Sequence, residues 1–139
     1  MGKKVTVIST SLRHGSNSAV LADAFAMGAS EAGNEVTLIS LTGKDIRFCT
    51  GCLACQKTGK CVIHDDMNDM QEIVRTSDVL VFATPIYYYE MSGQMKTFLD
   101  RLNPLYIADC QFKDVYLLAS AAEEDEYAMK RAKSGLEGW

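Results

Sequence analysis

Four cysteines lie close together in one short stretch of the sequence and form the pattern C-x2-C-x2-C-x5-C: Cys49, Cys52, Cys55 and Cys61. Gly51 and Gly59 give the backbone between them the freedom to fold around a small centre. Compact C-x2-C-x2-C runs with a fourth cysteine nearby suit the four thiolate ligands of a [4Fe–4S] cluster. Structural zinc more often uses two C-x2-C pairs separated by a longer span. The spacing of these four candidate metal ligands thus suits a cluster, and a zinc site, a two-cysteine redox centre and free thiols compete with it as interpretations.

The fifth cysteine, Cys110, lies far downstream of this run. A secreted disulfide framework would spread its bridges along the chain, whereas a tight group of cysteines in an intracellular protein is typical of metal or redox chemistry. We therefore expect Cys110 to be structural. The two histidines, His14 and His64, are expected to lie at the surface.

A second group of polar residues occupies the stretch from Ser9 to Ser18, which contains five hydroxyls, the amide of Asn17 and the guanidinium of Arg13. It follows a short β-branched run and precedes a helical pattern, so it leads into a helix N-terminus, where unpaired N–H groups favour a phosphate. It contains neither G-x-G-x-x-G nor Gly-Lys-Ser/Thr, so it is neither a dinucleotide fingerprint nor a Walker loop. Hydroxyl donors in place of glycines suit a terminal phosphate monoester. The alternative is a simple N-cap at Ser16 or Asn17 on a polar surface loop.

A third stretch, Thr84-Pro85-Ile86-Tyr87-Tyr88-Tyr89, is rich in aromatic residues. It follows a run that is apolar along its whole length, as expected for a strand buried on both faces of a parallel sheet. Consecutive tyrosines could pack in the core or form a dimer surface. Next to a phosphate loop, Pro85 and Ile86 could instead offer a flat ligand an apolar wall and backbone hydrogen bonds.

The elements that must position these residues alternate between strands and helices, which predicts an α/β fold with a parallel sheet and right-handed crossovers. Strands are expected over residues 4–9, 35–41, 78–84 and 115–120, and helices over 17–32, about 65–77, 93–102 and 123–134. The segment 42–62 has little periodicity and is expected to be a long loop that carries the cysteines. In open sheets of this kind ligands bind beyond the carboxyl ends of the strands. The polar loop after the first strand and the tyrosine loop after the third should therefore border one crevice.

A chain of 139 residues can form one domain, which we expect to span residues 1–139 with the cysteine-rich insertion at about 43–62. No strand follows the last predicted helix, so the fourth strand is expected to be an exposed edge of the sheet in this chain. Either the sequence is a fragment, or a partner chain covers that edge. The formal charge of −4 argues against a nucleic-acid surface. No apolar run reaches the roughly 20 residues that span a bilayer, and no signal peptide is recognisable, so a cytoplasmic protein is expected.

The polar loop resembles the Ser-x-Arg-x-x-x-Asn-Ser/Thr phosphate loop of the NADPH-dependent FMN reductase family, whose fold is flavodoxin-like. The resemblance implies a doubly wound parallel sheet of order 2-1-3-4, with the usual fifth strand apparently absent. It implies that Ser11, Arg13, Asn17 and Ser18 hold the phosphate of FMN, and we add Ser9 and Ser16 from the same loop. Leu12 and Ser16 replace residues that are often proline and glycine in the family, and neither change removes a donor.

The tyrosine stretch is similar to the Thr-Pro-x-Tyr segment of the same family, and the Lys-x-Phe-x-Asp-Arg helix of the family follows it here as residues 96–101. The resemblance implies contact between the flavin ring and Pro85, Ile86, Tyr87 and Tyr88. It implies a structural or oligomer-interface role for Lys96, Asp100 and Arg101. Ser120, at the end of the fourth strand, is expected to close over the flavin.

The cysteine spacing resembles the compact motif of the iron–sulfur flavoproteins, which are relatives of the FMN reductases. Taken together, the resemblances imply an FMN-dependent NAD(P)H oxidoreductase that uses a flavin or quinone acceptor, or ferredoxin if a [4Fe–4S] cluster passes single electrons. They imply a homodimer or homotetramer. The alternatives are an electron-transfer module with FMN and a cluster but no substrate of its own, and a zinc-bound interaction domain.

Overall fold

The computed structural model describes residues 1–139 and is built on one twisted sheet of four parallel strands. Strand β1 pairs with β2 on one side and β3 on the other, and β3 pairs with β5, which gives the order β2-β1-β3-β5. The parallel order predicted from the sequence is confirmed, with β5 as the fourth parallel strand and no fifth one. These strands are β1 (Lys4–Ser9), β2 (Glu35–Ser40), β3 (Val79–Tyr87) and β5 (Asp114–Ser120).

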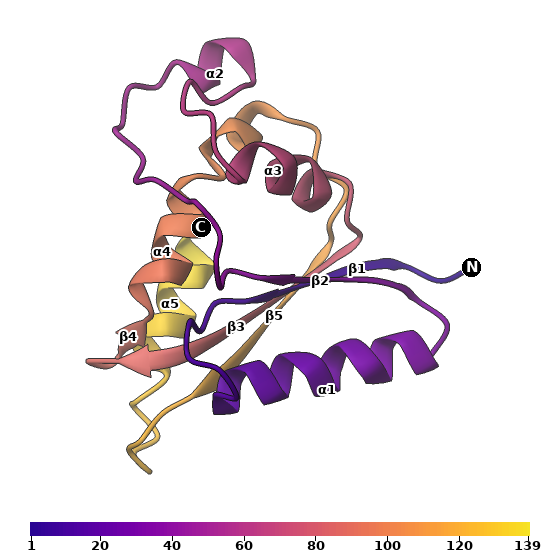
Figure 1. Cartoon of the computed structure of the whole chain (residues 1–139), viewed down its shortest axis with the longest axis vertical. Helices are drawn as coiled ribbons and strands as arrows, with labels where there is room; N and C mark the ends of the chain where they lie inside the picture. The colour runs from indigo at the N-terminus through magenta and orange to yellow at the C-terminus, as the bar shows by residue number, and fades with distance from the viewer.

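Helices cover both faces of the sheet (Figure 1). Helix α1 (Asn17–Glu31) lies alone on one face, and the other face carries α3 (Met67–Arg75), α4 (Gly93–Asp100) and α5 (Lys130–Gly138). A short helix, α2 (Cys55–Thr58), and a 3-10 helix, η1 (Asn103–Ile107), lie in the connections. No helix is both long and apolar enough to cross a bilayer.

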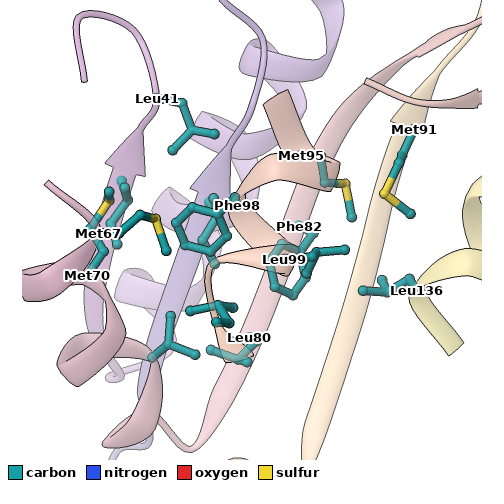
Figure 2. Close-up of a cluster of buried hydrophobic side chains, with 14 of the residues drawn as sticks. Leu41, Met67, Met70, Leu80, Phe82, Met91, Met95, Phe98, Leu99 and Leu136 are labelled. Atoms are coloured by element: carbon teal, nitrogen blue, oxygen red, sulfur yellow. The ribbon is translucent and has the colours of Figure 1, made fainter. Parts of the chain in front are cut away.

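Strand β3 shows how the sequence builds the two cores. Alternate side chains of a strand point to opposite faces, so a run that is apolar throughout can serve both. Val79, Val81 and Ala83 pack toward α1 in the smaller cluster. Leu80 and Phe82 join the larger cluster, together with methionines and leucines from α3, α4 and α5 (Figure 2). The sheet is thereby held rigid between two apolar layers, which fixes the positions of the loops at its carboxyl edge.

The structure corrects the predicted end of the third strand. The strand was expected to stop at residue 84, but β3 continues to Tyr87 and turns back into β4 (Glu90–Met91), which pairs with it in antiparallel register. The two-residue connection has positive φ at both Tyr88 and Tyr89, which is the geometry of a type I′ hairpin turn. Asn-Gly is the usual sequence signal for this turn, so two tyrosines at these positions do not predict a hairpin.

The predicted start of the last helix is also wrong. Helix α5 begins at Lys130 rather than at residue 123. Residues 123–126 are all acidic and exposed, so they have no apolar side chain to bury and would repel one another on a helix. The first buried side chain in this region is that of Ala128. Strand β5 pairs only with β3, which leaves its other edge open within this chain, as expected.

Candidate functional site

The loop between β1 and α1 combines buried hydroxyls with an exposed cation. The side chains of Ser9, Thr10, Ser11, Ser16 and Ser18 are all buried. The side chains of Arg13 and Asn17 are exposed, and none of the ion pairs of the chain involves Arg13. Gly15 adopts φ +64°, a conformation that most side chains disfavour, and so lets the loop turn into the helix. The cation therefore remains available for an anion at this end of the sheet.

Ser16 caps helix α1. Its Oγ accepts a hydrogen bond from the backbone N–H of Ala19 at 3.2 Å, and its hydroxyl lies 3.4 Å from that of Ser18. The first turn of a helix has no internal carbonyl for its leading N–H groups, so those of Asn17 and Ser18 remain as donors. Two backbone N–H groups, the hydroxyls and the positive end of the helix dipole thus point to an anion-binding site.

We predict that Ser16→Ala will lower the free energy of unfolding by about 1 kcal/mol, because it removes the cap of a fifteen-residue helix. Ser16→Asp should retain most of the stability, since aspartate is an equally good cap. Urea denaturation measures both effects. Equal losses for the two variants would contradict a capping role.

A buried network of hydroxyls joins the β1–α1 loop to the hairpin. Thr10 donates from its Oγ1 and from its backbone N–H to the carbonyl of Ala83, and its Oγ1 lies 3.3 Å from the Oγ of Ser92. The backbone N–H of Ser92 donates in turn to the Oγ1 of Thr84 at 3.0 Å. Thr10, Thr84 and Ser92 are each 0% exposed. These residues were not predicted as site residues, although their position at the carboxyl ends of neighbouring strands is a signal that could have found them.

The predicted ring-binding residues divide into two kinds. Pro85 and Ile86 are buried in β3, and the Ile86 side chain belongs to the larger core. Tyr87 and Tyr88 lie at the hairpin tip, with Tyr88 98% exposed. Ser120 lies opposite Pro85 in the ladder between β3 and β5 and is partly buried. The hairpin therefore presents aromatic faces to solvent at the same edge of the sheet as the β1–α1 loop.

The positive φ values of Tyr88 and Tyr89 predict that this turn stores strain. The double variant Tyr88→Asn/Tyr89→Gly, which has the preferred residues of a type I′ turn, is expected to raise the free energy of unfolding by roughly 1 kcal/mol. Tyr106→Asn, at an exposed tyrosine without positive φ, provides the control and should not stabilise the chain. Thermal unfolding tests the prediction, which fails if the double variant is no more stable than the wild type.

The four clustered cysteines border one small pocket of about 20 Å³, together with Arg101 and Asn103. Cys55 is buried, Cys61 is partly buried, and Cys49 and Cys52 are exposed. The amide of Asn103 donates a hydrogen bond to the Sγ of Cys55 at 3.2 Å. No three histidine, cysteine, aspartate or glutamate side chains are grouped closely enough to hold a metal ion. The structure thus brings the thiols to a common pocket without gathering them into a ligand set.

A much larger pocket than the one at the cysteines lies elsewhere. It has a volume of about 1290 Å³ and is a mostly apolar groove between β5, α4 and α5, lined by residues such as Leu99, Leu117 and Trp139. None of the predicted FMN-binding residues lines it, although Cys49 does. The large apolar groove and the polar loops at the carboxyl edge of the sheet are therefore separate features of the fold.

Comparison with known proteins identifies the family. The model of the family described as NADPH-dependent FMN reductase matches residues 3–136. The chain belongs to this family. An iron–sulfur flavoprotein of Archaeoglobus fulgidus is 37% identical over 102 residues, which cover 73% of this chain and 46% of the relative. An iron–sulfur flavoprotein of Methanocaldococcus jannaschii is 35% identical over 75% of this chain and 54% of its own length. This FMN reductase family chain spans about half the length of the curated relatives it matches.

Solved structures show the same fold. An NAD(P)H:quinone oxidoreductase from Methanothermobacter marburgensis superposes with a TM-score of 0.73 at 16% identity, over 99% of this chain and 75% of that one. An azoreductase from Bacillus anthracis also gives 0.73, at 17% identity, over 98% of this chain and 79% of its own. The predicted flavodoxin-like class of this FMN reductase family member is thereby confirmed.

Proposed function

We propose that residues 1–139 form one FMN-binding domain of an NAD(P)H-dependent oxidoreductase, with the phosphate of FMN bound between the β1–α1 loop and the start of α1. One observation carries the proposal: buried hydroxyls surround an open helix N-terminus at the carboxyl edge of a parallel sheet. Membership of the FMN reductase family supports FMN over other phosphate ligands.

Each residue of the loop has a distinct proposed task. The hydroxyl of Ser16 already accepts from Ala19, so its own proton is free to be donated to a phosphate oxygen. The guanidinium of Arg13 supplies the positive charge and a fork of N–H donors. The remaining proposed ligands are Ser9, Ser11, Asn17 and Ser18.

The hairpin is proposed to receive the ring. Tyr87 and Tyr88 would offer aromatic faces, whereas Pro85 and Ile86 would contribute through their backbone because their side chains are buried. Ser120 would face the ring from β5. Bound FMN supplies the hydride chemistry, so the chain needs no acid or base of its own and acts by binding and orienting. NAD(P)H is the proposed donor, and a flavin or quinone is the proposed acceptor.

We further propose that Cys49, Cys52, Cys55 and Cys61 hold a [4Fe–4S] cluster, which would supply one-electron transfer to a partner such as ferredoxin. The support is the spacing of the four thiols, their common pocket and the names of two curated relatives, both iron–sulfur flavoproteins. A homodimer or homotetramer is proposed for the assembly.

The decisive experiment is a visible spectrum of protein purified without oxygen, with flavin, iron and zinc analysis of the same sample. One FMN per chain, with NAD(P)H consumed in the presence of a quinone, is the expected result. FMN with a cluster but no steady NAD(P)H consumption would instead indicate an electron-transfer module. Colourless protein with stoichiometric zinc would indicate an interaction domain and would overturn the proposal.

A further inference from the structure

Arg101 has the largest fully buried side chain of the protein, and hydrogen bonds from its backbone N–H and to its backbone carbonyl fix its position. It follows α4, where its backbone N–H donates to the carbonyl of Thr97. Its carbonyl accepts from the amide of Gln71 on α3 at 2.7 Å. Only 1% of the residue is exposed. The guanidinium therefore projects from a rigid junction between two core helices.

The guanidinium reaches both ends of the cysteine loop, which we define as residues 48–62. Its Nη1 donates to the carbonyl of Arg47 at 2.7 Å, just before the loop. Beyond the loop, Nη1 and Nη2 donate hydrogen bonds to the two carboxylate oxygens of Asp65 at 2.6 and 2.9 Å. That carboxylate also accepts from the backbone N–H of Arg47 at 2.9 Å. One buried ion pair thus closes the base of a loop that contains all four clustered cysteines.

The same side chain brings positive charge to the cysteine pocket, which it borders together with Cys61. Burial by itself would lower the pKa of Arg101, but the bond to Asp65 and the neighbouring Cys61 raise it overall, so the group is a permanent cation. The Nε of Arg101 is buried and has no acceptor. One N–H donor is therefore unused in a side chain that borders the cysteine pocket.

We propose that Arg101 is the positioning residue of the cysteine loop: anchored by Asp65, it joins the two ends of the loop and places a fixed positive charge beside Cys61, so that the four thiols stay at one common pocket. The ligand role rests on the proposed function, whereas the closure of the loop does not. Asn103 would assist by orienting the sulfur of Cys55.

The test measures how fast iodoacetamide modifies each cysteine in the reduced, metal-free chain, with peptide mass spectrometry to locate the label. In the wild type, Cys55 and Cys61 should react more slowly than the exposed Cys49 and Cys52. Arg101→Lys and Asp65→Asn both break the bidentate ion pair between Arg101 and Asp65. In these variants modification of Cys55 and Cys61 should accelerate by about tenfold or more, because the loop opens locally.

Arg75→Lys provides a matched control, since Arg75 also forms a bidentate pair with a carboxylate, that of Glu72, but on the surface of α3. This variant should leave the rates of the four clustered cysteines within about twofold of the wild type. Rates of Cys55 and Cys61 in Arg101→Lys that match those of Arg75→Lys would overturn the proposal.

Hydrogen exchange of the wild type gives a second test that does not require either variant to fold. The N–H of Arg47, bonded to Asp65, should be protected like the core of α4, whereas that of Phe48 should exchange rapidly. Equal, rapid exchange at both positions would overturn the proposal.

Anaerobic reconstitution separates this inference from the proposed function. We expect Arg101→Lys to retain less than half of the iron and sulfide that the wild type takes up. A wild type that takes up none would contradict the proposed cluster, while cysteine modification would still decide the role of Arg101. Full iron uptake by Arg101→Lys would refute the positioning role.

Discussion

Asp65→Asn is expected to lower the free energy of unfolding by about 3–5 kcal/mol, because it leaves the charge of Arg101 buried without its partner. Both side chains of this pair are 0% exposed. The carboxylate also accepts hydrogen bonds from the backbone N–H groups of Arg47 and Met67. Asparagine replaces one carboxylate oxygen by an NH2 group, which is itself a donor and cannot accept these bonds. Urea denaturation followed by the fluorescence of Trp139, the single tryptophan, measures the change.

Glu72→Gln is the control for this prediction. It breaks an ion pair with Arg75 that has similar bidentate geometry, but the side chain of Glu72 is 63% exposed. Exposed pairs contribute only about 0–1 kcal/mol, so the control should remain close to the wild type. A loss for Asp65→Asn no larger than that of Glu72→Gln would refute the structural importance of the buried pair.

The same pair predicts a pH dependence. Burial alone would raise the pKa of Asp65, but the bonds from Arg101 and from the backbone of Arg47 and Met67 lower it overall. A lowered pKa in the folded state stabilises the fold fully above the ordinary aspartate pKa of about 4, and this contribution is lost as the pH falls through the folded value. The stability difference between wild type and Asp65→Asn should therefore be constant near neutral pH and shrink below about pH 4.

Arg13→Gln is expected to weaken FMN binding by roughly 10- to 100-fold, because a charge-assisted bond to the phosphate contributes about 1.5–3 kcal/mol. Riboflavin has the same ring but no phosphate, so its affinity should change by less than about twofold. Arg131→Gln on α5 removes an equal charge from another exposed position and should leave both affinities unchanged. Titration of flavin fluorescence at fixed ionic strength measures the affinities of the wild type and both variants for the two flavins.

The pattern of effects decides this prediction. A parallel loss of FMN and riboflavin affinity in Arg13→Gln would mean that the side chain supports the fold of the loop and does not contact the phosphate. An unchanged FMN affinity would place the phosphate elsewhere. Either result would remove the main support for the proposed cofactor site.

Local patterns predicted much of the fold. The first strand was expected at residues 4–9 and is observed as Lys4–Ser9, and the first helix was expected at 17–32 and is observed as Asn17–Glu31. Both are bounded by short-range signals, a β-branched run in one case and a cap with a following Gly-Asn stop in the other. The hairpin at Tyr88 and Tyr89 was missed because its backbone is imposed by pairing between β3 and β4, against the preference of the two residues.

The sequence by itself determined the composition of the candidate site: a hydroxyl-rich loop before a helix, a tyrosine run after a buried strand, and four cysteines at close spacing. These are properties of neighbouring residues, so they can be read along the chain. Only the tertiary structure decided that Thr10, Thr84 and Ser92 join the two loops, and that Arg101 lies buried under the cysteines and not at the surface. An arginine in a helical pattern gives no sign of burial, because its cost is met by Asp65 and by the Arg47 carbonyl, partners that lie 36 and 54 residues away along the chain.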